Sequence, residues 1–116
     1  MAMEVLFASL PVANLDAAIG WYERFFGRAA DIIPNDDEAM WRVADNGWLY
    51  VINDPRRAGR TVVTISFGDL AEVVALLADR GVSAAPIEAV GDEGLKSNVH
   101  DPDGNVLSLI QVASAS

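Results

Sequence analysis

The first third of the chain alternates between strand-like and helix-like spacing of apolar residues. The stretch EVLFASLPV, residues 4–12, is rich in residues that favour strands, and the apolar positions that follow recur at helical spacing over residues 15–26. Asn14 is suited to cap the amino end of this helix, and Gly27 is suited to close its carboxyl end. A strand followed by a capped amphipathic helix is therefore predicted.

Three short strands are predicted to follow this helix. Their expected positions are residues 29–33, 39–43 and 48–52. The tripeptide Asp-Asn-Gly at 45–47 predicts a tight hairpin between the last two, because Asn-Gly tolerates the positive φ angles of such a turn. The first half of the chain thus reads as βαβββ.

The second half repeats this order. RTVVTISF at 60–67 predicts a strand, and GDLAEVVALLADRG at 68–81 predicts a helix in which Asp69 and Glu72 have the spacing of a capping box. Three further strands are expected over 82–87, 95–99 and 105–112.

The two halves also resemble each other in sequence. NGWLYVI at 46–52 aligns with GNVLSLI at 104–110, and the two helical stretches align as well. Internal duplication is the simplest explanation. We therefore expect an α+β fold in one domain over residues 1–116, made of tandem modules at about 3–53 and 61–113. Each sheet would keep one face that its own helix does not cover, and two such faces opposite each other would enclose a cleft.

Composition narrows the possible partners. Hydrophobic residues make up 52% and charged residues 22% of the chain, as in folded globular domains. The formal net charge of −9 disfavours binding to nucleic acid, which depends on Lys and Arg. No apolar run approaches the length of a membrane span, and the amino-terminal stretch lacks a basic region, so we expect a cytoplasmic protein without membrane contact. The absence of cysteine excludes disulfides and thiolate chemistry.

Two motifs resemble the vicinal oxygen chelate superfamily, which includes glyoxalase I, extradiol dioxygenases, fosfomycin-resistance enzymes and bleomycin-resistance proteins. They are LPVANLDAAIGWYERFFG, which resembles the strand-to-helix opening of that superfamily, and DPDGNVLSLIQ, which resembles its closing turn and strand. The resemblance extends from about Val5 to Val112. It implies paired βαβββ modules and, in small members, homodimers whose clefts are built from two modules.

Metal-using members of the superfamily hold a divalent cation with His, Gln or Glu in that cleft. The resemblance places the corresponding positions at Phe7, Tyr50, Thr64 and Ser108. Phenylalanine has no donor atom, and neutral hydroxyls are weak donors beside carboxylate or imidazole. We therefore expect no metal site and no cofactor, and Ser108 stands where a metal-binding member would carry glutamate.

The same inward positions suggest an organic ligand instead. Strand alternation places Trp48 in phase with Tyr50, and Trp41 on the neighbouring strand joins them if its phase agrees. The candidate ligand-binding residues are Phe7, Ser9, Trp41, Trp48, Tyr50, Thr64, Ser66 and Ser108. Aromatic rings with a few hydroxyl groups are typical of a pocket for a small organic molecule.

Other chemistries have weaker support in the sequence. His100 is the only histidine, and an isolated histidine at a strand end favours a surface role over a metal-ligand role. A triad of Ser108, His100 and a neighbouring aspartate lacks a nucleophile elbow, and GDEGLKS at 91–97 lacks the spacing of a phosphate-binding loop. No catalytic residue is predicted.

Three functional hypotheses follow. The first is a metal-independent protein similar to the bleomycin-resistance group, which sequesters a bulky organic molecule, cationic or planar, between two subunits. The second is a glyoxalase-like lyase, isomerase or dioxygenase that uses a non-standard metal site, or the same cleft without metal. The third is an interaction module whose cleft is filled by its own side chains.

Overall fold

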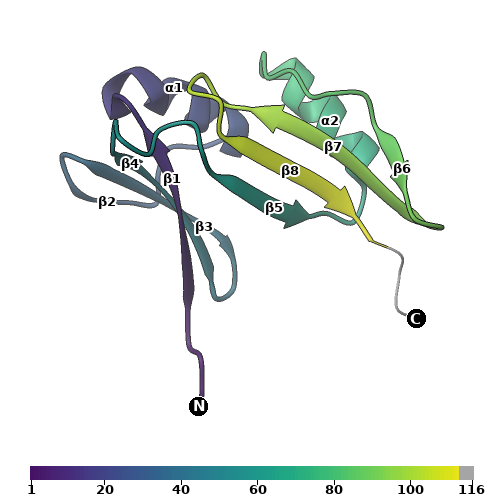
Figure 1. Ribbon diagram of the computed structural model, residues 1–116, viewed down its shortest axis with the longest axis horizontal. Helices are drawn as coiled ribbons and strands as arrows, with labels where there is room; N and C mark the ends of the chain where they lie inside the picture. Colours follow the sequence, from purple (N-terminus) through teal and green to yellow (C-terminus); the bar gives the residue numbers. More distant parts are fainter. Residues whose placement is uncertain (113–116) are drawn as a thin grey trace.

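The computed structural model describes residues 1–112 and has an α+β fold with two four-stranded sheets and two helices (Figure 1). In chain order the elements are β1 (Leu6–Val12), α1 (Leu15–Phe26), β2 (Ile32–Asn35), β3 (Glu38–Ala44), β4 (Gly47–Asn53), β5 (Val62–Ser66), α2 (Leu70–Asp79), β6 (Glu88–Val90), β7 (Gly94–His100) and β8 (Val106–Gln111). Residue 113, the expected end of the second module, lies outside the described residues. Among the helices of the described part, neither is long and apolar enough to cross a bilayer.

Both sheets have the same topology. The strand order is β1-β4-β3-β2 in the first sheet and β5-β8-β7-β6 in the second. In each, the first and last strands of a βαβββ unit pair in parallel, and the remaining neighbours pair antiparallel. The fold class predicted from the duplicated sequence pattern is confirmed.

Side-chain caps begin both helices where the sequence predicts, and a glycine ends α1. The Asn14 side chain accepts a hydrogen bond from the backbone N–H of Ala17 at 3.2 Å, and the Asp69 carboxylate accepts one from Glu72 at 3.1 Å. Gly27 ends α1 with a φ of 77°, a left-handed conformation that glycine adopts without steric cost. These local signals set where each helix begins and where α1 ends.

One predicted strand is wrong. Residues 82–87 do not form a strand, and β6 instead covers the three residues Glu88–Val90. Val82 is buried because it packs into the core directly after α2. Ala85 makes one backbone hydrogen bond to Asn98, at 2.9 Å, and the next residue, Pro86, has no N–H to donate to a ladder. The apolar character of this segment reflects burial of single side chains rather than strand pairing.

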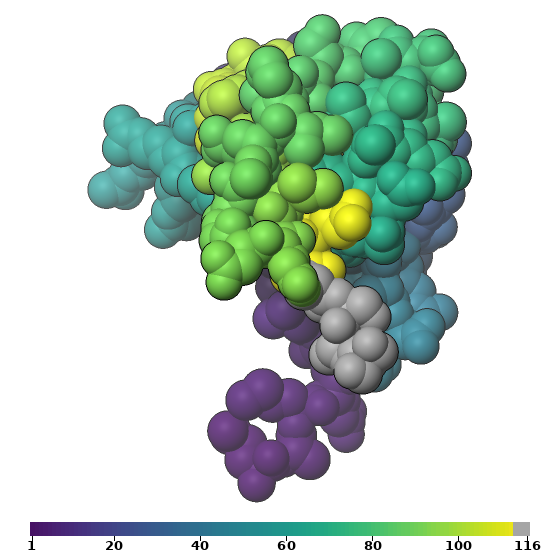
Figure 2. All heavy atoms as spheres, turned by 90° about the vertical axis from the view of Figure 1, so that its right-hand side faces the viewer, coloured from purple at the N-terminus to yellow at the C-terminus, as the bar shows by residue number. Residues whose placement is uncertain are grey.

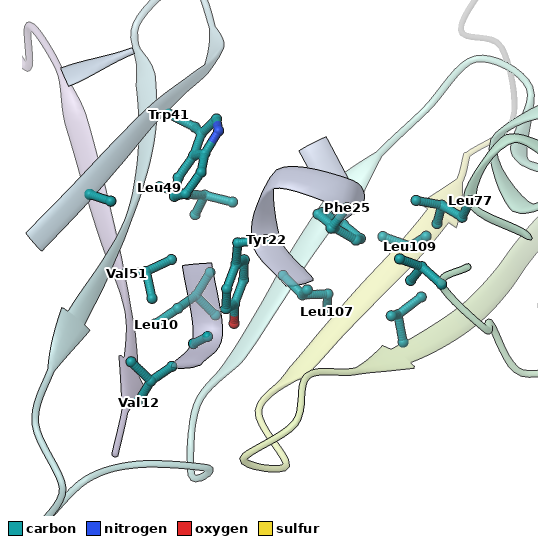
Figure 3. Packing of buried hydrophobic residues seen from close by; sticks show 14 of the residues in the cluster. Leu10, Val12, Tyr22, Phe25, Trp41, Leu49, Val51, Leu77, Leu107 and Leu109 are labelled. Atoms are coloured by element: carbon teal, nitrogen blue, oxygen red, sulfur yellow. The ribbon is translucent and has the colours of Figure 1, made fainter. Parts of the chain in front are cut away.

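The hydrophobic core is shared by both sheets. Figure 3 shows Tyr22 and Phe25 of α1 lying between side chains of the first sheet on one side and of the second sheet on the other. The labelled contributors from the strands and α2 are Leu10, Val12, Trp41, Leu49, Val51, Leu77, Leu107 and Leu109. The side of each sheet that faces this core is thus covered, and the opposite side, here called the open face, points away from it.

A buried hydrogen-bond network ties the two halves together. The Tyr22 hydroxyl donates to the Asp101 carboxylate at 2.5 Å, and the Asn105 amide donates to that carboxylate at 2.7 Å and to the Pro11 carbonyl at 2.6 Å. The Asn105 side-chain oxygen accepts from the Thr61 N–H at 3.0 Å. Burial and the adjacent Asp101 carboxylate raise the pKa of Tyr22 above its ordinary value. The network joins β1, α1 and the turn before β8.

The amino-terminal segment projects from the rest of the molecule. Figure 2 shows it, in purple, standing away from the main body, and its apolar residues Met1, Met3 and Val5 are exposed. Leu6 and Phe7, at the start of the edge strand β1, are 71% and 51% exposed. One chain therefore leaves apolar surface uncovered at this edge.

Candidate functional site

The open face of the first sheet carries four of the predicted ligand-binding residues. Phe7 pairs with Trp48, and Ser9 pairs with Tyr50, so the four lie in two adjacent rows of β1 and β4. The rings of Phe7 and Trp48 are stacked, with their centroids 6.2 Å apart and their planes at 22°. Trp48 and Tyr50 are half-buried. The arrangement is an aromatic surface with a hydroxyl group beside it.

The open face of the second sheet carries the remaining hydroxyl residues. Thr64 pairs with Ser108 across β5 and β8, and Ser66 follows on the same side of β5. On the other flank of β8, Asn98 of β7 pairs with Ser108. Ser108 is 9% exposed because it lies on a central strand between these two neighbours, whereas Thr64 and Ser66 are exposed. On this face the hydroxyl groups are interspersed with the aliphatic side chains of Val62, Val106 and Ile110, whereas the first face carries aromatic rings.

One acceptor on the second open face lacks a partner. The Asn98 side-chain oxygen is buried and makes no hydrogen bond within the part of the chain that the structure describes. A buried acceptor without a partner costs free energy, so such a group is suited to accept a hydrogen bond from a ligand or another chain. Sequence analysis missed Asn98, although its position opposite Ser108 could have been predicted by pairing the strands at 95–99 and 105–112.

Trp41 does not belong to the open face. It pairs with Leu49 rather than with Trp48 or Tyr50, so its phase is the opposite one, and it is 0% exposed. Its ring stacks on Phe26 at 4.7 Å, and its indole N–H donates to the Arg28 carbonyl at 3.1 Å. The condition for including Trp41 among the ligand-binding residues is not met, because the residue is part of the core.

The two open faces lie on the outer sides of the shared core and do not enclose a cleft within one chain. Two cavities, of about 280 and 180 Å³, open elsewhere, and none of the eight predicted residues lines either of them. A cleft that combines both faces would therefore need a second copy of the chain.

The residues at the family's metal positions do not fit a metal ion. The pairing register places Phe7 in the row that Val62 occupies in the second sheet, whereas the counterpart of Thr64 in the first sheet is Ser9. The row of Phe7 and Trp48 and its counterpart in the second sheet supply only apolar side chains. The row of Ser9 and Tyr50 and its counterpart, Thr64 and Ser108, supply only neutral hydroxyl groups. No cluster of three His, Asp or Glu side chains suited to a metal occurs in residues 1–112.

Charged residues border both faces. Arg42, on β3, lies beside Trp48, and its guanidinium donates to the Asp45 carbonyl. Lys96, on β7, forms an ion pair with Glu88 at 3.4 Å. Lys96 is therefore neutralised by a carboxylate of the chain, and the Arg42 side chain is held at the turn between β3 and β4.

Comparison with known proteins places the fold. A glyoxalase/bleomycin resistance protein from Catenulispora acidiphila DSM 44928 is 31% identical with a TM-score of 0.89, and the match covers 96% of this chain and 100% of that chain. A bleomycin-binding protein from bleomycin-producing Streptomyces verticillus, in complex with copper(II)-bleomycin, is 17% identical with a TM-score of 0.78, covering 98% and 99% of the two chains. The oxidase ChaP-H1 is 17% identical with a TM-score of 0.74, covering 99% and 100%.

No protein-family profile and no curated protein matches the chain. The two structures at 17% identity establish similarity of fold alone. The Catenulispora protein is similar over nearly the whole of both chains and at higher identity. This chain belongs to the glyoxalase/bleomycin resistance protein family.

Proposed function

We propose that this protein binds a bulky organic molecule, planar or cationic, between the open face of the first sheet of one copy and the open face of the second sheet of another. The observation that carries the proposal is the stacked pair of Phe7 and Trp48 beside half-buried Tyr50 on an uncovered sheet face. Aromatic rings give planar ligands a large contact area at low cost in side-chain entropy.

The second face would contribute polar contacts. Thr64 and Ser108 offer hydroxyl groups, and the Asn98 oxygen offers a buried acceptor without a partner. A ligand that carries an N–H or ammonium donor would satisfy that acceptor, and the net charge of −9 would favour a cation over an anion at long range. The similar Streptomyces verticillus structure contains copper(II)-bleomycin, which is the reason for choosing bleomycin as a first probe.

The proposal includes a homodimer. Exposed apolar side chains gather on the two edge strands, with Leu6 and Phe7 on β1 and Val62, 66% exposed, on β5. Edge strands also present unpaired backbone groups, which favour association with another chain. Sedimentation velocity should give twice the monomer mass at micromolar concentration. A monomer at that concentration, with ligand present, would refute the two-copy cleft.

A cytoplasmic location is part of the same proposal. It is supported by the absence of cysteine from the sequence, since disulfide-bonded proteins belong to oxidising compartments. Fractionation of cells that produce the protein from its own gene should recover it with the cytoplasmic fraction.

Ligand binding can be tested by isothermal titration with metal-free bleomycin and with copper(II)-bleomycin. Trp48→Ala should weaken the affinity about tenfold, because it removes one member of the stacked pair, equivalent to about 1.4 kcal/mol. Trp21→Phe is the matched control, since Trp21 lies in α1 and stacks on Phe25 rather than on the open face. Equal affinities for the two variants would remove Trp48 from the site.

The enzyme hypothesis is tested in the same preparation. Protein purified without chelator should be analysed for zinc, nickel, manganese and iron. A stoichiometric metal would favour a glyoxalase-like or dioxygenase activity through ligands other than those assigned here. Failure of both forms of bleomycin and of other planar cations to bind, by titration and by thermal shift, would overturn the proposed function.

A further inference from the structure

A second concave site lies apart from the stacked rings and hydroxyl groups described above, although Arg42, which borders the first open face beside Trp48, is one of its lining residues. It is a cavity of about 280 Å³ between the carboxyl end of α1, the end of β5 and helix α2. Its apolar lining includes Phe25, Phe26, Ile65, Phe67, Leu76 and Leu77. Pockets for drug-sized ligands measure about 300–1,000 Å³, and this cavity lies just below that range, so its occupant would be smaller than a drug-sized molecule. None of the residues assigned to the open-face site contributes to it.

The lining of this cavity is unusually rich in arginine for so acidic a chain. Arg28, Arg42 and Arg80 all line it, which is three of the eight basic residues in a protein of net charge −9. They come from the residue after Gly27 at the end of α1, from β3 and from the residue that caps α2. Chain topology thus gathers separate cations around one apolar hollow, here called the basic cavity.

Two of these guanidinium groups are fixed in place by backbone acceptors. An Arg80 nitrogen donates to the Phe25 carbonyl at 3.3 Å, and an Arg28 nitrogen donates to the Arg42 carbonyl at 2.6 Å. Arg28 also forms an ion pair with Asp31 at 3.0 Å, and its hydrogen bond lowers the pKa of that carboxyl below its ordinary value. No carboxylate is hydrogen-bonded to Arg80 in the described part of the chain. The positive charge of Arg80 therefore lacks a hydrogen-bonded counter-ion.

We propose that the basic cavity binds a small monocarboxylate with an apolar body, such as a medium-chain or single-ring acid. The apolar chain would lie against Phe25, Phe67 and Leu77, and the carboxylate would accept hydrogen bonds from Arg28 and Arg80. This preference for an anion is opposite to that of the open faces. The proposal does not depend on the proposed function, because the two sites share no residue.

The test compares three ligands of equal chain length on the wild-type protein: octanoate, octanol and octyltrimethylammonium. Binding is followed by ¹⁵N–¹H spectra, so that each affinity comes with a location. Octanoate should shift the amides of Gly27, Phe67 and Arg80, and octanol should bind about tenfold more weakly because it lacks the charge-assisted hydrogen bonds. Equal affinities for octanoate and octanol, or shifts confined to β1 and β4, would overturn the proposal.

Variants supply the second measurement. Arg28→Gln and Arg80→Gln should each weaken octanoate binding about tenfold, because each removes one charged donor. Arg57→Gln is the matched control: it removes the same charge from an exposed residue that pairs with Asp54 and does not line the cavity. If Arg80→Gln fails to fold, Arg28→Gln and the wild-type ligand series still decide the outcome.

The competing occupant is the apolar amino-terminal segment of a second copy. Removal of residues 2–5 distinguishes this occupant from a small acid. Unchanged octanoate affinity supports a free cavity for a small acid. Octanoate binding that arises only after this deletion would show that the chain's own end fills the cavity, and would overturn the proposal.

Discussion

Replacement of the buried Asn105 side chain by alanine should destabilise the fold. Asn105 is fully buried, and its side chain joins three separate parts of the chain: Pro11 at β1, Thr61 before β5 and Asp101 in the turn before β8. Asn105→Ala deletes all three hydrogen bonds and leaves a small polar void. Because the partners belong to both halves of the duplicated fold, the loss falls on the junction between them.

The expected cost follows from the groups left without partners. The Pro11 carbonyl and the Thr61 N–H each lose the side chain that satisfied them, and a buried polar group without a partner costs about 1–3 kcal/mol. Asp101 keeps the Tyr22 hydroxyl and two backbone N–H groups as donors, so its carboxylate contributes little to the loss. The sum is about 3 kcal/mol, which corresponds to a fall in Tm of about 10 °C for a domain of this size.

Urea unfolding followed by circular dichroism measures this loss. The control is Asn35→Ala, which removes an exposed amide whose oxygen accepts only the Asp37 N–H at 2.8 Å, and which should change the free energy of unfolding by about 0.5 kcal/mol or less. A loss below about 1 kcal/mol for Asn105→Ala would mean that water or local rearrangement satisfies the freed groups, and would refute the reasoning.

Three further changes test individual contacts. Tyr22→Phe should cost about 1–2 kcal/mol at neutral pH in urea unfolding, because it removes a buried donor from Asp101. The pKa of Tyr22 is raised in the folded state, so the stabilisation by its hydroxyl is full below about pH 10 and is lost as the pH rises further. The unfolding free energies of the wild type and of Tyr22→Phe should therefore converge in alkaline solution. A difference that stays constant with pH would contradict the pKa shift. Gly27→Ala should cost about 1–2 kcal/mol by the same assay, because φ is 77° there and the added methyl would meet the Arg80 guanidinium; an unchanged midpoint would argue against this. Asp69→Ala should lower the Tm through loss of about 1 kcal/mol at the α2 cap, and an unaltered Tm would show that the cap is dispensable.

Local signals in the sequence predict most of the fold. Asn14, Gly27 and Asp69 mark helix ends with side-chain or backbone chemistry that acts within four residues, and the structure uses each as predicted. The alignment of Tyr50 with Ser108 in the duplicated stretches also predicts which sides of β4 and β8 are alike. Signals of this kind need no knowledge of distant contacts.

The errors arise where distant contacts decide. Residues 82–87 have the composition of a strand, but Val82 is taken into the core beside α2 and Pro86 cannot extend a ladder. Trp41 could lie on either side of its sheet until the pairing with Leu49 fixes its phase. The gathering of three arginines from separate elements likewise depends on tertiary packing.

The placement of one core between two sheets has a genetic consequence. The open faces of the first and second sheets of a single chain lie on opposite sides of that core. A substitution on one face can therefore be carried by one copy of the chain, and a substitution on the other face by a second copy. In the homodimer proposed above, mixing a chain altered at Trp48 with one altered at Ser108 would give hybrid pairs in which one cleft carries both changes and the other carries neither. Such subunit complementation would restore wild-type affinity to that cleft, although each parent binds the ligand more weakly.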